Sequence, residues 1–145
     1  MSDSFVSNFM RAAVYITGME RALAVNMDME ILDSMDLQQA DIESERFTGV
    51  EAIQKAFASG RYEITNNLKI DPAKAPTTNT NFSDLRVVIV LPLMGHGAVY
   101  LDRPLRGGMI PKEVIEKLMA LAEYVVQQEQ TEANASDLAA MYEQL

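Results

Sequence analysis

His96 has the most versatile chemistry in this sequence, because an imidazole can act as a general base or ligate a metal. It is the only histidine, the chain has no cysteine, and glycines flank it at positions 95 and 97. A metal site would therefore need carboxylates for all its other ligands, and no motif places such a set beside it. We interpret His96 as an exposed residue of a tight turn.

A run of acidic residues is a second candidate site. Residues 28–45 contain seven acids and no base. Asp28, Asp33 and Asp36 could ligate a cation, but the run lacks the spacing and the turn glycine of a Ca²⁺ loop. The alternative is a solvated loop in which like charges repel one another into water. We favour the solvated loop and predict no metal site.

Two arginines lie just before an expected helix, which is one way to build an anion site. The stretch 102–108 includes Arg103 and Arg106 but lacks the spacing of a phosphate-binding loop. The alternative is a short polar loop with a structural role.

No serine or threonine lies in a nucleophile elbow. We therefore predict that the chain is not an enzyme and needs no cofactor.

The composition narrows the classes of partner. Of 145 residues, 48% are apolar and 23% are charged, as expected for one globular domain over residues 1–145. The net charge is −9 and the basic residues are scattered, which argues against nucleic acid as a partner. The absence of cysteine excludes disulfides and thiolate chemistry. With no signal peptide and no apolar run near the roughly 20 residues that span a bilayer, we expect a cytoplasmic protein without membrane association.

Helical and alternating apolar patterns predict the elements that would position these residues. The expected helices cover residues 4–17, 47–59, 110–128 and 136–145, and the expected strands cover 21–27, 31–32, 62–70, 85–93 and 98–101. Polar loops are expected at 71–84 and 102–108. This order favours an α+β fold, with helices packed on the faces of a mainly antiparallel sheet of five to six strands.

Four stretches, in the right order, resemble the GAF domain family of small sensory and interaction modules. Residues 97–104 (GAVYLDRP) are similar to the family's strand reading G-V-L-Y-L-D, and residues 85–93 (LRVVIVLPL) resemble its buried strand ending in V-P-L. Residues 17–22 (TGMERA) resemble its T-G-A-E-R-A entry, and residues 50–62 resemble its helix, glycine and strand. The resemblance covers nearly the whole chain and implies a GAF-like α+β fold.

The resemblance is not to the cyclic-nucleotide or bilin-binding members of this family. The signature of the cyclic-nucleotide type is not intact, because Asn67, Lys69, Phe82 and Asp84 are wrongly spaced and no glutamate follows. The bilin-attaching members need a cysteine, which this chain lacks.

The resemblance leaves two functional interpretations open. One is a sensor of an unidentified small molecule, bound in a pocket between the sheet and residues 47–84. The polar groups implied for that pocket are Asn66, Asn67, Lys69, Asp84 and Arg86. The other, which we favour, is a non-catalytic signalling module that acts by homodimerisation or by binding a signalling protein. GAF domains commonly dimerise through terminal helices, and the helical tail at 129–145 is then expected to dock or to dimerise.

Overall fold

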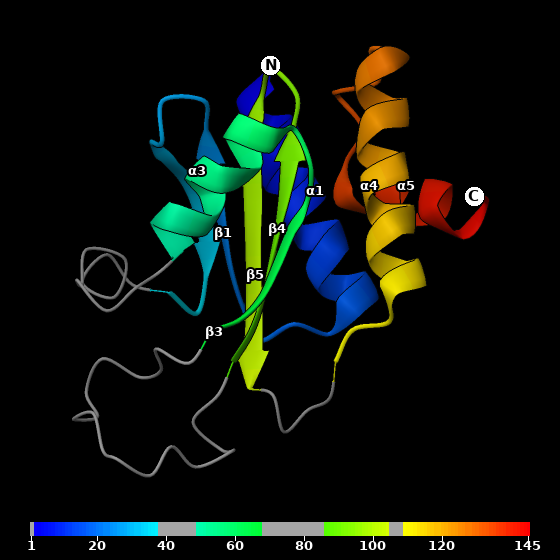
Figure 1. Ribbon diagram of the computed structural model, residues 1–145. Coiled ribbons are helices and arrows are strands. Elements are labelled where there is room, and N and C mark those ends of the chain that lie inside the picture. Colours follow the sequence, from blue (N-terminus) through cyan, green and yellow to red (C-terminus); the bar gives the residue numbers. More distant parts are fainter. Residues whose placement is uncertain (1, 38–48, 68–85, 105–108) are drawn as a thin grey trace, which may run out of the picture.

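The computed structural model describes residues 2–37, 49–67, 86–104 and 109–145 (Figure 1). It has the α+β fold predicted from the sequence, with four helices and a five-stranded antiparallel sheet in these residues. The helices are α1 (Ser2–Thr17), α3 (Gly49–Ser59), α4 (Lys112–Gln127) and α5 (Ala135–Glu143). The strands are β1 (Arg21–Asn26), β2 (Ile31–Met35), β3 (Glu63–Asn67), β4 (Arg86–Leu93) and β5 (Gly97–Pro104).

The sheet has the order β2-β1-β5-β4-β3, with β5 in the centre. The tight hairpin predicted between β4 and β5 is present, and β1 lies on the other side of β5. The start of β5, at position 97, requires a glycine. Its φ is +151°, and a Cβ atom at this position would lie 2.0 Å from the carbonyl oxygen of Val25 on β1. The close approach of β1 to β5 therefore depends on Gly97.

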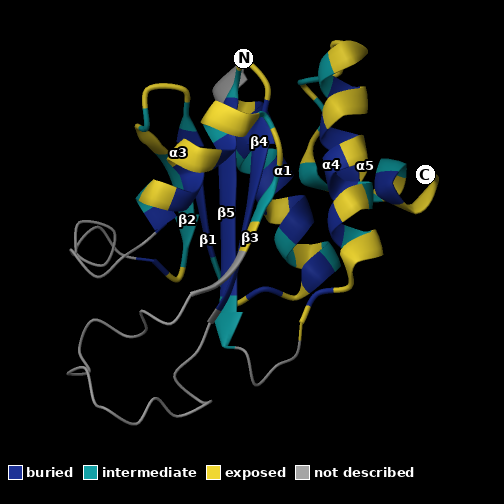
Figure 2. Cartoon of the chain, in the orientation of Figure 1, coloured by how far each residue is buried: buried dark blue, intermediate teal, exposed yellow. Residues whose placement is uncertain are grey.

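The inner strands β1, β5 and β4 are mostly buried, as Figure 2 shows, whereas the edge strand β2 is partly exposed. One face packs against α1 and α4, and the other against α3 (Figure 1). Strand β4 contributes Val87, Ile89 and Leu91 to the first core, and Val88 and Val90 to the second. This alternation confirms the prediction from its apolar sequence that β4 is covered on both sides.

Helix α1 forms because its apolar residues recur at helical spacing, and Phe5, Phe9 and Met10 are fully buried. It ends at Gly18, whose φ of +70° is unfavourable for other residues. The hydroxyl of Thr17 donates to the carbonyl oxygen of Ala13 and so holds the last turn.

Helix α5 lies in the 129–145 tail and packs against α1 and α4. Its N-terminus is capped by Asn134 and Asp137, each accepting from the other's backbone N–H. Leu138 and Tyr142 are buried against the rest of the chain, whereas Leu145 is 52% exposed. The ammonium of Lys117 on α4 lies over the Tyr142 ring, 4.4 Å from its centroid.

Two expected loops are partly strand. Residues 31–35, within the acidic run, form β2 and pair with β1, because this pairing gives their backbone N–H and C=O groups hydrogen-bond partners. The charge pattern of the run does not reveal this pairing. Asp102 to Pro104 continue β5 and pair with β4 and β1. The predicted loop 71–84 and the rest of the 102–108 stretch, from residue 105, lie outside the described residues. Among the described helices, none is long and apolar enough to cross a membrane.

Candidate functional site

The implied ligand-binding residues fall at one end of the β3–β4 pair. In the antiparallel register, Asn66 lies opposite Val87 and Asn67 lies opposite Arg86. The structure therefore brings Asn67 and Arg86 together through their backbones. The side chains of Asn66, Asn67 and Arg86 are outside the described part of the structure. Lys69 and Asp84 also lie outside the described residues.

The predicted pocket lies on the α3 face of the sheet, and chain atoms fill the part of that face beneath α3. Ile53 and Ala56 of α3 are fully buried against the sheet. The sheet residues in this core are Leu23, Val25, Val88, Val90, Ala98 and Tyr100. Direct packing of α3 on these side chains excludes a ligand from the space directly beneath the helix.

A buried polar cluster lies on the same face, beyond the α3 core. Asp102 on β5 is fully buried, and its carboxylate accepts from Nε and Nη2 of Arg21 on β1, both at 2.8 Å. The hydroxyl of Tyr100 also donates to this carboxylate. Burial alone would lower the pKa of Arg21, but the hydrogen bond and the charge of Asp102 raise it above its ordinary value. The cluster therefore holds a charge pair that is tightly bonded within the chain.

Strand register explains why these three residues meet. Asp102 is directly opposite Arg21 in the β1–β5 pair, and Tyr100 precedes Asp102 by two residues and so shares its face. Sequence analysis missed this cluster because it placed Asp102 in a polar loop. The alternating Tyr100-Leu101-Asp102 pattern was the signal that the strand continues.

His96 differs from its predicted state. It was expected to be an exposed turn residue, but it is only half-exposed, and its ring packs edge-on against Phe5 of α1 with the centroids 5.2 Å apart. Its Nδ1 atom is buried and finds no hydrogen-bond partner among the described residues. The turn position was correct, with the backbone N–H of His96 donating to the carbonyl oxygen of Leu93. The exposure was wrong because α1 packs over the turn, a contact distant in sequence.

The acidic run does not bring three carboxylates together in the described residues. Asp33 instead accepts from Ser7 Oγ at 2.6 Å and from Arg11 on α1, which joins β2 to that helix. Burial alone would raise the pKa of Asp33, but hydrogen bonds from Ser7, the Ser34 backbone and Arg11 hold it below its ordinary value. No group of three or more His, Asp or Glu side chains suited to a metal occurs in the described ranges.

The anion site suggested at 102–108 is only partly described. Arg103 belongs to strand β5 and is half-buried, whereas Arg106 lies outside the described residues. Met10, Met19 and Met119 are buried.

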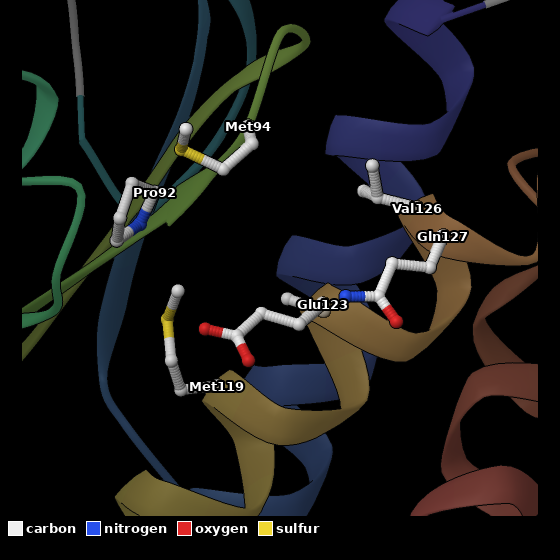
Figure 3. A pocket seen from close by; sticks show the side chains of 7 residues that line it. Pro92, Met94, Met119, Glu123, Val126 and Gln127 are labelled. Carbon is white, nitrogen blue, oxygen red and sulfur yellow. The ribbon is translucent and has the colours of Figure 1, made fainter.

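A surface groove, which sequence analysis did not predict, runs along one side of α4 (Figure 3). Its first part is a pocket of about 130 Å³ between α4 and the β4–β5 hairpin. The residues around it are Pro92, Met94, Met119, Ala122, Glu123, Val126 and Gln127. Its second part, of about 470 Å³, lies between α4 and the segment 60–62 that precedes β3. Met119 and Glu123 line both parts, so the two parts adjoin each other along α4, and we refer to them together as the α4 groove.

The groove has an apolar floor and acidic groups along α4. Met94 is 59% exposed, although it is large and apolar, and Met119 forms the floor beside it. Figure 3 shows the Glu123 carboxylate extending from α4 into the space toward Pro92 and Met119. Glu116 lines the second part, with Arg61 on the opposite wall. This arrangement can hold an apolar group and a cation side by side.

Comparisons of the chain with family models, with curated proteins and with solved structures found no significant match.

Proposed function

We propose that this chain is a non-catalytic, GAF-like signalling module that acts in the cytoplasm by binding a protein, either a partner or a second copy of itself. The observation that carries the proposal is the contrast between the filled space beneath α3 and the open surface groove beside α4. The space beneath α3 is filled by the chain's own side chains, whereas the α4 groove is open and exposes Met94. A partner's apolar side chain can be buried in an open groove with an apolar lining.

The groups with the strongest potential for chemistry support a binding role over a catalytic one. The Asp102 carboxylate is occupied by Arg21 and Tyr100 and has no exposed surface. The imidazole of His96 lies against Phe5, and its buried Nδ1 has no carboxylate to orient it among the described residues. A general base needs access to a substrate proton and a neighbour that sets its orientation.

A homodimer through the terminal helices would use their outer surfaces. The inner faces of α1, α4 and α5 are buried in the core of the same chain. The large apolar or aromatic residues left exposed on or just beyond these helices are Tyr15, Tyr124 and Leu145, at 82%, 44% and 52%. Aromatic side chains of this kind are frequent anchors in protein interfaces.

Sedimentation velocity over a range of protein concentrations tests the self-association form of this proposal. We expect a concentration-dependent dimer that Tyr15→Glu weakens, with the exposed Ser136→Glu as a control for added charge outside these positions. A pull-down with the wild-type chain as bait tests binding to other proteins. If the chain stays monomeric and the pull-down retains no protein, the proposed function is wrong.

A second candidate function is that of a small-molecule sensor. The β3–β4 register favours it, because Asn67 lies directly opposite Arg86 at one end of this strand pair, and both belong to the polar groups implied for the pocket. Native mass spectrometry of the protein as purified tests it. An added small mass that Arg86→Ala removes would support the sensor, and a bare protein mass with no ligand-induced rise in Tm would argue against it.

A further inference from the structure

We infer that the α4 groove binds an amphipathic, basic helical segment of a protein partner. This inference rests on the proposed function, since it names the surface and the partner chemistry of the binding module. The four observations that support it are the length of the groove, its methionines, its carboxylates and the net charge of the chain.

The groove has the length of a short helical segment. Glu116, Met119, Glu123 and Val126 are three or four residues apart and so lie along one side of α4. From Glu116 to Gln127, α4 rises about 16 Å, which corresponds to about three turns of a second helix laid beside it. An amphipathic helix that binds in such a groove inserts apolar residues at i, i+3, i+4 and i+7.

The floor of the groove suits an apolar anchor of the partner. The pocket between Met94 and Met119 has a volume of about 130 Å³, close to the roughly 150 Å³ of a cavity that accepts a benzene ring. One leucine or phenylalanine side chain of a partner therefore fits it. The thioethers of Met94 and Met119 are flexible and polarisable, so the floor can adjust to the anchor that enters.

The charges select a basic partner over an acidic one. Glu123 extends over the apolar floor and makes no ion pair with any described residue. Among the described residues, Glu116 forms an ion pair only with Lys112, at 3.6 Å, and both of these side chains are largely exposed. Arg61 is the one basic residue lining the described groove, against the two glutamates. A lysine or arginine beside the apolar anchor would pair with Glu123, and the net charge of −9 would attract such a segment from a distance.

Fluorescence polarisation with two synthetic helical peptides tests the inference on the full chain. The first peptide has leucines at i, i+3, i+4 and i+7 with lysines at the remaining positions, and the second has glutamate in place of every lysine. We expect the lysine peptide to bind and the glutamate peptide not to bind. If neither peptide binds, or both bind equally, the inference is wrong.

Variants in the groove separate specific docking from general attraction to an acidic protein. We expect Glu123→Lys to weaken the lysine peptide about tenfold, and Met94→Ser to weaken it about as much. Glu132→Lys makes the same charge change at an exposed residue outside the groove lining, and we expect no more than about a twofold effect. Equal weakening by Glu132→Lys and Glu123→Lys would show that net charge alone drives binding, which overturns the inference.

The oligomeric state keeps failure of this inference distinct from failure of the proposed function. If Met94→Ser and Glu123→Lys dissociate a dimer of this chain and the lysine peptide does not bind, the groove holds a second copy. That result overturns the inference about a basic partner segment but supports the proposed binding module. Met94 and Glu123 are exposed in the free chain, so both variants should fold like the wild type.

Discussion

Replacement of Asp102 by alanine should be among the most damaging single changes to the stability of this domain. The Asp102 side chain has no exposed surface, and Arg21, its partner, keeps only 22% of its side chain exposed. Removal of the carboxylate would leave the Arg21 guanidinium half-buried without its counter-charge, and the Tyr100 hydroxyl without this acceptor. Breaking a buried ion pair typically costs 3–5 kcal/mol. Because Arg21 retains some contact with water, we expect a loss of about 3 kcal/mol for Asp102→Ala.

Urea denaturation followed by circular dichroism measures this loss as a shift in the transition midpoint at constant slope. Asp28→Ala, at an exposed aspartate in the β1–β2 turn, is the matched control and should change the free energy of unfolding by less than about 0.5 kcal/mol. The double variant Arg21→Met with Asp102→Leu removes both charges together and should recover most of the loss. A cost below about 1 kcal/mol for Asp102→Ala, or no recovery in the double variant, would refute this account of the cluster.

Three further predictions concern other contacts. Asp33 has a pKa held below its ordinary value of 3.8, so its stabilising effect is complete above pH 3.8 and is lost as the pH falls through the lower folded-state pKa. Asp33→Asn should therefore make the free energy of unfolding less dependent on pH in this acid range, as measured by circular dichroism. The same pH dependence in the variant and the wild type would contradict this prediction. His96→Phe removes a buried nitrogen that has no hydrogen-bond partner among the described residues, and it keeps the edge contact with Phe5, so the Tm should stay constant or rise. A large fall in Tm would show that the imidazole makes a hydrogen bond that the fold requires. Gly97→Ala places a Cβ against the Val25 carbonyl oxygen and should cost about 2–4 kcal/mol in urea denaturation, and a neutral result would refute the close β1–β5 approach.

Local sequence pattern was sufficient for the fold class and for the presence of each described helix and strand, but not for the ends of β2 and β5. The valine-rich run 85–93 was predicted to be a strand, and its apolar residues do not alternate with polar ones, which is typical of a strand buried on both faces. Glycines at positions 18 and 60 directly follow α1 and α3, and both adopt a positive φ that other residues disfavour. These features depend on residues close together in the chain, so the sequence alone determined them.

The tertiary structure decided which side chains meet across long sequence separations. Asp102 seemed to belong to a polar loop, and only the β1–β5 register placed its carboxylate against Arg21, 81 residues away. His96 seemed exposed until α1 packed Phe5 against its ring. The α4 groove depends on packing of the β4–β5 hairpin beside α4, which sets Met94 near Met119. No local pattern encodes these contacts, because each one forms when two elements pack together. The periodicity of an element shows which of its faces is buried, but it does not show which other element covers that face.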